Sequence, residues 1–256
     1  MEVRRSIRAT LNGLDRRFGL RQWLWRGAEA DEELRLASLG ARDPFLTSPE
    51  LQHPPPRTVI DVGGSHGQFA REIFRAFPGA TIYSFEPIPE CYEELRALSQ
   101  TRAELRPLRL ALSDEDGERE FFVSRFRDSS SLQPMLPAHT AAFPGTETET
   151  RIVVEAARLD AVAARLTLTP PVFAKLDVQG HELSVIRGGR QTLALCQRVM
   201  TECNFAPLYE GQPSFVELYA EMKALGFLFD GFVGHLRHPR TGELLSADAI
   251  FYRPAD

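Results

Sequence analysis

Segments typical of strands and of helices alternate along most of this 256-residue chain. Short runs rich in β-branched and aromatic residues predict strands, and most are followed by a run with helical periodicity. Parallel strands need long crossover connections, so this alternation predicts an α/β fold with helices on both faces of a parallel sheet. Ligands of such sheets bind at the carboxyl ends of the strands. The predicted strands are residues 58–63, 81–87, 105–113, 151–159, 171–178, 198–204, 226–233 and 247–254, and the predicted helices are 66–77, 89–99, 181–196 and 215–225.

The chain is long enough for one α/β domain with an extension. The proline-rich residues 53–56 predict a stiff spacer between an N-terminal helical extension at 1–56 and a main domain at 57–256. Within the main domain, the loop-rich residues 113–150 predict an insertion. The basic start of the extension predicts an amphipathic helix that packs on its own domain, joins a second subunit in a homodimer, or makes weak contact with an anionic membrane surface. Its apolar residues are Val3, Ile7, Leu11, Leu14 and Phe18, followed by Trp23 and Trp25.

The composition argues against several classes of protein. A formal net charge of −5 gives no sign of the basic face that nucleic acid needs, so no nucleic-acid partner is expected. No apolar run reaches the length of a membrane span, so no transmembrane segment is expected. Cys91, Cys196 and Cys203 form no CxxC pair, which argues against a disulfide framework and a zinc site. Reduced thiols and the lack of a secretory signal predict a cytoplasmic protein.

The stretch TVIDVGGSHGQF at residues 58–69 places glycines where a predicted strand meets a predicted helix. A dinucleotide fingerprint needs a glycine at position 62, which is Val62, and a P-loop needs a GK[ST] triplet that does not follow. What remains is an acid with two glycines, Asp61, Gly63 and Gly67. Glycine lets the backbone approach a ligand closely, and the acid accepts hydrogen bonds from that ligand directly or through water. The alternative is a tight turn that needs glycine only for its backbone conformation.

A second acid strengthens the ligand interpretation. Glu86 ends the next predicted strand, where a carboxylate accepts hydrogen bonds from both hydroxyls of a ribose. Viewed alone, Glu86 before Pro87 is an ordinary solvated acid. Ser113 and Asp114 follow the third strand, where the base of a nucleoside would lie. A ribose and an adenine without a phosphate together indicate S-adenosylmethionine.

A third group of polar residues begins at the end of the strand at 171–178. Asp177 is expected to point towards the glycine loop, and His181 lies just beyond it. On the next strand, Glu202 and Asn204 alternate, so both face one side. If the two strands are neighbours, these side chains converge. The alternative makes Asp177 a helix-capping acid and His181 a surface residue of the first turn.

Several segments, in this order across residues 58–253, resemble the FkbM-type S-adenosylmethionine-dependent methyltransferases. They are VIDVGGSHGQF, FEPIPECYEEL, LALSDEDGEREFFV, DSSSLQP, RLD at 158–160, KLDVQGHELSVIRGG, ECNFAPLYEGQP and ADAIFYRP. The resemblance implies a class I methyltransferase fold, a Rossmann-like three-layer sandwich with a mostly parallel seven-stranded sheet and an antiparallel last strand. It also implies methyl transfer to oxygen, on a hydroxyl of a sugar, a glycan or a polyketide-like secondary metabolite.

The resemblance assigns Asp61, Gly63 and Gly67 to the methionine part of the cofactor and Glu86 to its ribose. It assigns Asp177 and residues 180–182 to the edge of the active site. The sequence departs from the family pattern twice, because Gly64 stands where alanine is usual and Gln179 stands where glutamate is usual. The first change is expected to be harmless, and the second removes a charge. The expected binding set for S-adenosyl-L-methionine and its product S-adenosyl-L-homocysteine is Asp61, Gly63, Gly64, Ser65, Gly67, Glu86, Pro87, Ser113, Asp114 and Asp177.

Methyl transfer to an alcohol needs a group that takes the hydroxyl proton. His181 titrates near neutrality, and Asp177 or Glu202 qualifies if burial raises its pKa. His181 and Asp177 rank first as the catalytic base. Alternatively, a metal acidifies the hydroxyl, and Asp177, Glu202 and Asn204 would offer oxygen ligands to Mg²⁺. The sequence leaves this choice open.

The insertion at 113–150 is expected to cover the site of a small-molecule or glycan acceptor. Its residues Arg125, Phe126, Arg127 and Ser129–Ser131 offer donors and a stacking face, and Tyr209 with Glu210 forms a second candidate wall. Other hypotheses stay open, because a fold does not fix the acceptor atom. They are an N- or C-methyltransferase, a non-catalytic S-adenosylmethionine-binding docking module of a biosynthetic assembly, and a nucleoside-binding oxidoreductase, against which the missing first glycine speaks.

Overall fold

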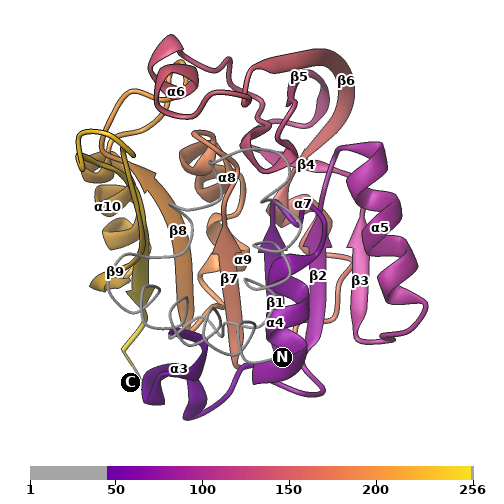
Figure 1. Ribbon diagram of the computed structural model, residues 1–256. Helices are drawn as coiled ribbons and strands as arrows, with labels where there is room; N and C mark the ends of the chain where they lie inside the picture. The colour runs from indigo at the N-terminus through magenta and orange to yellow at the C-terminus, as the bar shows by residue number, and fades with distance from the viewer. Residues whose placement is uncertain (1–44, 255–256) are drawn as a thin grey trace, which may run out of the picture.

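The computed structural model describes residues 45–254, and its centre is a seven-stranded sheet in the order β3-β2-β1-β7-β8-β10-β9 (Figure 1). Five strands are parallel to one another, and β10 runs antiparallel to both of its neighbours. This is the class I methyltransferase fold, which confirms the predicted fold class and the antiparallel last strand. The strands are β1 (Thr58–Val62), β2 (Thr81–Phe85), β3 (Leu105–Leu108), β7 (Val172–Leu176), β8 (Arg198–Asn204), β9 (Leu228–Arg237) and β10 (Leu244–Tyr252).

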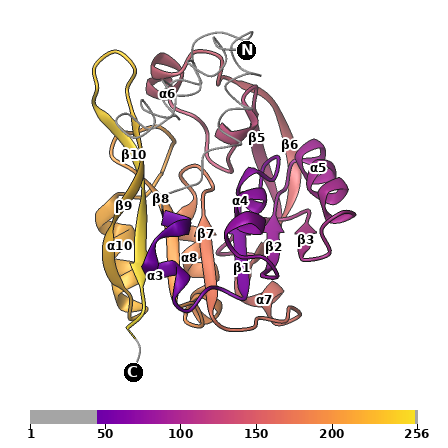
Figure 2. The ribbon, with the colours of Figure 1, turned by 60° about the horizontal axis from the view of Figure 1, so that its bottom comes forward.

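Helices cover both faces of the sheet and complete the three layers (Figure 2). On one face, Phe69 and Ile73 of α4 pack with Val59 of β1 in a buried apolar cluster. On the other face, Ile186 of α8 and Leu218 of α10 belong to a second cluster. Strands buried on both sides explain why β1 and β7 consist mostly of apolar residues. The helices are α4 (Gln68–Ala76), α5 (Pro89–Ser99), α7 (Leu159–Ala163), α8 (Glu182–Gly188), α9 (Arg190–Leu193) and α10 (Phe215–Ala224).

The third predicted strand, 105–113, is wrong as a single element. Residues 105–108 form β3 beside β2, and β4 (Ala111–Ser113) leaves the main sheet to pair with β6 (Thr148–Arg158). The apolar pattern runs through both pieces because Leu110 and Leu112 stay in the core. Periodicity shows that these side chains are buried, but it does not show which strand takes the backbone hydrogen bonds.

The insertion is more regular than the loop-rich segment predicted at 113–150. It contains β5 (Gly117–Ser124), the 3-10 turn η3 (Arg127–Ser129) and α6 (Pro137–Ala142). β5 pairs antiparallel with β6, which gives a second sheet in the order β4-β6-β5. In Figure 1 the strands β5 and β6 lie at the upper right of the view and α6 at the upper left, above the main sheet.

The helix predicted at 181–196 is broken in two. α8 ends at Gly188 and α9 begins at Arg190. A Cβ atom at Gly188 would lie only 1.9 Å from the backbone oxygen of Ser113, so this glycine lets β4 pass directly against the helix. The break therefore lies where the helix contacts the end of β4.

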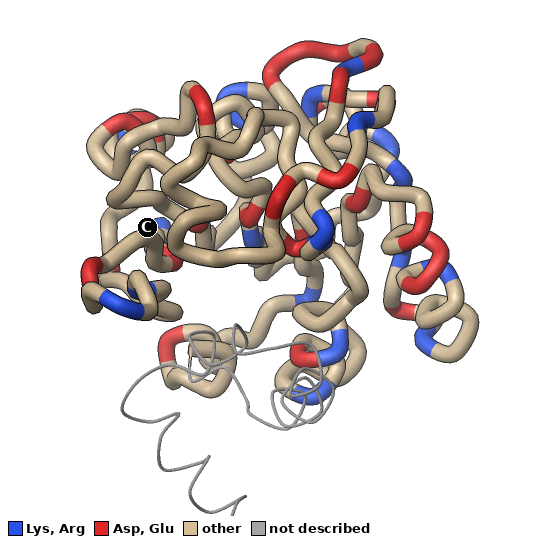
Figure 3. Tube along the Cα trace, turned by 45° about the horizontal axis from the view of Figure 1, so that its top comes forward, with Lys and Arg blue, Asp and Glu red and all other residues tan. Residues whose placement is uncertain are grey.

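Residues before the proline spacer also contribute to the core. The 3-10 turn η2 (Phe45–Thr47) and the short helix α3 (Pro49–Gln52) lie under the α4 face, where the rings of Phe45 and Phe173 have centroids 5.9 Å apart. The amphipathic helix predicted within residues 1–27 lies outside the described residues. Among residues 45–254, no helix is long and apolar enough to cross a membrane. Figure 3 shows acidic and basic residues interspersed over the view from the top of the molecule.

Candidate active site

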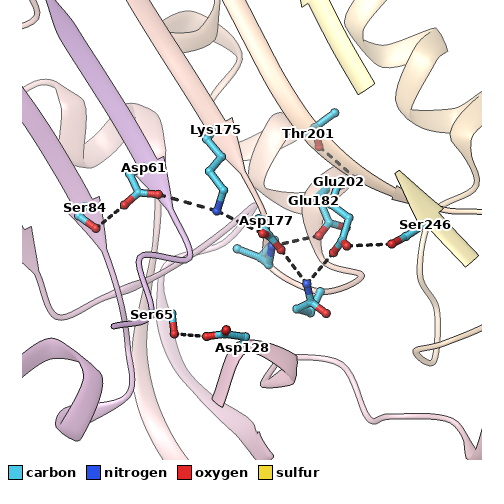
Figure 4. Close-up of polar contacts among 12 residues, drawn as sticks. Asp61, Ser65, Ser84, Asp128, Lys175, Asp177, Glu182, Thr201, Glu202 and Ser246 are labelled. Carbon is cyan, nitrogen blue, oxygen red and sulfur yellow. Dashed lines mark hydrogen bonds and ion pairs between the residues drawn. The ribbon is translucent and has the colours of Figure 1, made fainter. Parts of the chain in front are cut away.

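Strand alternation places the polar residues of the site on the face of the sheet that α4 covers. Val59 of β1 and Phe173 of β7 belong to the apolar core beneath α4. Side chains two positions further along a strand face the same side, so Asp61 and Lys175 continue these two rows at the carboxyl ends. Their strands pair in register at these two residues. Figure 4 shows the resulting row from Ser84 through Asp61 and Lys175 to Asp177.

The loop after β1 carries the predicted glycines, and two of them have backbone conformations that favour glycine. Gly63 has φ +86° and Gly67 has φ +78°. The backbone N–H groups of Gly63 and Gly64 both donate to the oxygen of Phe85 at 3.0 Å. A Cβ atom at Gly63 would lie 2.0 Å from the backbone oxygen of Asp177. The loop therefore needs glycine at this position partly because the end of β7 passes against it.

Gly64 is matched to a serine on the neighbouring strand. A Cβ atom at Gly64 would lie 2.1 Å from Ser84 Oγ, which donates a 2.7 Å hydrogen bond to Asp61 Oδ2. The departure from the alanine usual in the family is therefore accommodated in this chain by the position of Ser84. Alanine at this position would have to displace the Ser84 hydroxyl from Asp61.

Asp61 is fully buried, and burial raises its pKa, while Lys175 and the Ser84 hydroxyl act in the opposite direction. Its Oδ1 atom has no hydrogen-bond partner among the described residues, and Lys175 Nζ lies 3.9 Å away. A buried carboxylate oxygen without a hydrogen bond is costly unless a ligand or water completes it. This oxygen fits the donor that the ammonium group of S-adenosylmethionine would provide.

Glu86 supports the same loop. It lies just beyond β2 and accepts from Ser65 N at 2.9 Å and from Ile88 N at 2.8 Å. Burial raises the pKa of Glu86 to about 7 against the lowering effect of these two bonds. Each carboxylate oxygen can accept a further hydrogen bond, so Glu86 keeps the capacity to bind ribose hydroxyls. Pro87 follows it, partly buried and without a donor of its own.

The insertion reaches over the glycine loop. Ser65 Oγ donates to the carboxylate of Asp128, which belongs to η3. Ser65 itself has φ +42°, a left-handed conformation unusual for a residue with a side chain. The contact was not predicted from the sequence, because Ser65 and Asp128 are 63 positions apart. It places the insertion beside the candidate cofactor site.

Ser113 and Asp114 lie together at the end of β4. Ser113 Oγ donates to Asp114 Oδ1 at 3.1 Å and lies 3.0 Å from His181 Nε2. The other ring nitrogen of His181 lies 3.0 Å from the side-chain nitrogen of Gln133. Burial lowers the pKa of His181 to about 4. The structure therefore brings His181 to Ser113 and Gln133, with both ring nitrogens engaged and the ring neutral at pH 7.

Asp177 and Glu202 come together across β7 and β8, as predicted for neighbouring strands. The amide nitrogen of Gln179 donates to Asp177 Oδ1 at 2.7 Å and to Glu202 Oε2 at 2.6 Å. Lys175 Nζ lies 3.2 Å from Asp177 Oδ2, and Ser246 Oγ donates to Glu202 Oε1 at 3.1 Å (Figure 4). The two acids are thus held by a cation, an amide and a hydroxyl.

Lys175, Gln179 and Ser246 were not predicted as members of this site. Lys175 was detectable, because a lysine inside a strand with otherwise apolar residues is rarely buried unless it is paired. Its side chain is 8% exposed and also lies over the Phe69 ring, 5.2 Å from the centroid. Ser246 comes from β10, whose pairing with β8 the sequence does not reveal.

Asn204 lies two positions after Glu202 and is buried, 6% exposed. No group of three or more His, Cys, Asp or Glu side chains within residues 45–254 is arranged to hold a metal ion.

Glu182 follows His181 and accepts from the backbone nitrogens of Val178 and Gly180. Burial raises the pKa of Glu182 to about 7. Glu182 therefore fixes the turn that carries Gln179.

Of the residues predicted to line the acceptor site, Phe126 and Arg127 are at least partly exposed, whereas Ser131 and Tyr209 are buried and bind Gln179. Arg127 pairs with Glu149 at 2.9 Å, and Phe126 is 38% exposed. Ser131 Oγ donates to the backbone oxygen of Gln179 at 2.8 Å, so the insertion holds the turn after β7. Tyr209 is buried, and its hydroxyl donates to Gln179 Oε1 at 2.9 Å. Tyr209 thus lies behind the acids instead of forming an exposed wall.

Comparison with known proteins identifies the family. The Methyltransferase FkbM domain matches residues 61–229. The 2-O-methyltransferase NoeI of Sinorhizobium fredii is 30% identical over 168 residues, which cover 63% of this chain and 69% of that protein. Methyltransferase sdnD of Sordaria araneosa is 27% identical over 153 residues, which cover 51% of this chain and 59% of that protein, less than two thirds of its length.

Among solved structures, this chain is similar to the magnesium protoporphyrin IX methyltransferase of Synechocystis with bound S-adenosylmethionine. The TM-score is 0.47 at 13% identity, with 96% of this chain and 97% of that chain covered. The family assignment depends instead on the FkbM match and on NoeI. The chain belongs to the FkbM methyltransferase family and is an S-adenosylmethionine-dependent methyltransferase.

Proposed function

We propose that this enzyme transfers a methyl group from S-adenosylmethionine to a hydroxyl oxygen of a sugar, a glycan or a polyketide-like secondary metabolite. The observation that carries this proposal is the pair of acids, Asp177 and Glu202, at the carboxyl ends of β7 and β8. A hydroxyl becomes a good nucleophile only when a nearby group takes its proton. Two carboxylates beside the candidate cofactor loop supply that acceptor.

The cofactor is assigned to the loop after β1 and the end of β2. Asp61 Oδ1 is the buried acceptor for its ammonium group, and Glu86 accepts from its ribose hydroxyls. Gly63, Gly64, Ser65 and Gly67 allow the backbone to approach it. When bound, S-adenosylmethionine supplies a methyl group on a sulfonium, a leaving group that needs no acid. The chain therefore has to position the acceptor and take one proton.

Asp177 is the favoured base. Its side chain is 17% exposed, and Lys175 beside it favours the ionised carboxylate. Glu202 is 7% exposed and is the second choice. His181 is less suited, because burial disfavours the protonated ring that it would become and because both of its ring nitrogens are already engaged. In the step, the acceptor oxygen bonds to the methyl carbon, the carbon–sulfur bond breaks with its electron pair going to sulfur, and Asp177 receives the hydroxyl proton.

Two observations support a polyhydroxylated acceptor. The relative NoeI is described as a 2-O-methyltransferase. The insertion, with Phe126 exposed and Arg127 a quarter exposed, offers the ring and donor that a sugar recognises. The insertion contacts both the glycine loop, through Asp128, and the turn at Gln179, through Ser131. This position suits a wall of the acceptor site.

The test is incubation of the full chain with S-adenosylmethionine carrying a ¹³C-methyl group and a panel of glycans and polyketide-like alcohols. The expected product is a methyl ether, recognised by its carbon chemical shift, together with an equal amount of S-adenosylhomocysteine. A product with the methyl group on nitrogen or carbon would contradict the proposed transfer to oxygen. Failure to bind S-adenosylhomocysteine in calorimetry would contradict the cofactor assignment.

A further inference from the structure

The amide of Gln179 lies between the two acids of the site. Its nitrogen is 2.7 Å from Asp177 Oδ1 and 2.6 Å from Glu202 Oε2, so each amide hydrogen is directed to a different carboxylate. Its oxygen lies 2.9 Å from the Tyr209 hydroxyl, whose single proton is shared with the backbone oxygen of Ser129 at 3.1 Å. Both donors and the acceptor of this side chain are therefore used.

The orientation of the amide is fixed by its surroundings. If the amide turned over, its oxygen would face two carboxylates, and the nitrogen would face Tyr209. Burial raises the pKa of Tyr209 well above its usual range, so its hydroxyl keeps its proton and can donate. The turned amide would lose two bonds to charged acceptors, which are stronger than bonds between neutral groups.

The backbone of Gln179 is held as firmly. Gln179 has φ +57°, a left-handed conformation that a residue with a side chain adopts at an energetic cost. Ser131 Oγ donates to its backbone oxygen at 2.8 Å, and Glu182 accepts from the nitrogen of the next residue, Gly180. Contacts from the insertion and from α8 thus keep this unusual conformation in place.

We propose that Gln179 is a positioning residue. It holds the carboxylates of Asp177 and Glu202 side by side, so that both can accept hydrogen bonds from the substrate that is methylated. Two carboxylates that bind the same amide nitrogen repel each other when that donor is removed. The Gln179 amide replaces this repulsion with two charge-assisted hydrogen bonds. The significance for catalysis rests on the proposed function, whereas the coupling of the two acids through Gln179 is independent of it.

A double-mutant cycle on thermal stability tests this coupling without an acceptor molecule. Glu202→Gln is measured in the natural chain and in a Gln179→Met background, where the side chain keeps its length but has no donor. In the natural chain, Glu202→Gln weakens a bond to Gln179, and Tm is expected to fall by about 2–4 °C. In the Gln179→Met chain, the same change removes a repulsion, and Tm is expected to rise by a similar amount.

The reversal of sign separates positioning from packing. If Gln179 only filled space, Glu202→Gln would change Tm by the same amount in both backgrounds, because independent sites are additive. Such additivity would overturn the proposal. Gln191→Met, on the exposed side of α9, is the matched control and should leave the effect of Glu202→Gln unchanged.

A second background keeps the test decisive if Gln179→Met does not fold. Gln179→Glu places a third carboxylate between the two acids, so Glu202→Gln should again raise Tm. A fall in Tm in this background would overturn the proposal. Calorimetry with S-adenosylhomocysteine on the same variants should show binding within about twofold of the natural chain. Loss of binding by the natural chain itself would count against the cofactor assignment and would leave the stability cycle valid.

Discussion

Gly63 and Asp177 touch through their backbones, because a Cβ atom at Gly63 would lie 2.0 Å from the backbone oxygen of Asp177. Asp177 N in turn donates to Val62 O at 3.0 Å. The candidate cofactor loop and the favoured base are therefore parts of one rigid corner between β1 and β7. A change that moves one of them is expected to move the other.

Gly63→Ala should destabilise the fold and weaken cofactor binding together. The added methyl group meets backbone atoms, and its residue must also keep φ +86°. We expect a loss of about 2–4 kcal/mol in the free energy of unfolding, from overpacking and backbone strain. Urea denaturation and calorimetry with S-adenosylhomocysteine measure the two effects.

Gly79→Ala is the matched control for this prediction. Gly79 has φ +91°, but a Cβ atom there would have no neighbour within 4 Å. Backbone strain alone should cost about 1–2 kcal/mol and leave binding unchanged. Equal losses at both glycines would show that the contact with Asp177 is unimportant.

Gly64→Ala should be harmful alone and tolerated with Ser84→Ala. The new methyl group would lie 2.1 Å from Ser84 Oγ, and removing that hydroxyl makes room for it. We expect Gly64→Ala to lower the free energy of unfolding by about 1–3 kcal/mol. The double variant should be close to Ser84→Ala alone in urea denaturation. No recovery in the double variant would contradict the pairing of these two positions.

Affinity for S-adenosylhomocysteine should fall as the pH is lowered through about 7, the raised pKa of Glu86. The ionised carboxylate accepts hydrogen bonds from Ser65 N and from the ribose, and protonation removes part of this capacity. Calorimetry at pH 8 and pH 5.5 should differ by up to about tenfold in Kd, roughly the effect of one lost hydrogen bond to a charged group.

Glu86→Gln should abolish this pH dependence of binding, at a lower overall affinity.

The effect of Glu86 on folding stability has the opposite sign, because its folded pKa is above its unfolded value. The folded state then binds more protons, and the contribution of Glu86 to stability falls as pH rises from about 4.5 through about 7. A Glu86→Gln chain with the same pH dependence of binding as the natural chain would assign the effect to another group.

Removal of divalent metal ions should leave methyl transfer unchanged. The oxygens of Asp177 and Glu202 that face each other are already bonded to the Gln179 amide. The assay with ¹³C-methyl S-adenosylmethionine should give the same rate in EDTA as in Mg²⁺, within about twofold. A loss in EDTA that Mg²⁺ restores would favour the alternative in which Asp177, Glu202 and Asn204 bind a metal.

Buried strands and strand-end acids could be predicted from the sequence, because each has a local cause. β1 and β7 are fully buried, so most of their residues are apolar, and the face of Asp61 follows from the alternation of side chains. The proximity of Asp177 and Glu202 needed only the assumption that β7 and β8 are neighbours, which the structure confirms.

The parts that could not be predicted depend on contacts between distant segments. The sequence ranks His181 beside Asp177 as a first candidate for the base, because nothing near His181 in the sequence shows that Ser113 and Gln133 lie at its nitrogens. The split of residues 105–113 depends on the pairing of β4 with β6, more than 40 positions later. The sequence shows Gln179 only as the loss of a charge relative to the glutamate that is usual in the family. Its contact with Glu202, 23 positions away, could not be predicted.

The most direct test of the central claim compares Asp177→Asn with the natural chain in transfer of a ¹³C-methyl group to the hydroxylated acceptor found in the screen. We predict that Asp177→Asn lowers kcat by at least about 100-fold, the lower end of what a general base contributes. Its Kd for S-adenosylhomocysteine should stay within about twofold. Two results would contradict the account. One is an Asp177→Asn chain with normal kcat, and the other is a product of the natural chain that carries the methyl group on nitrogen or carbon.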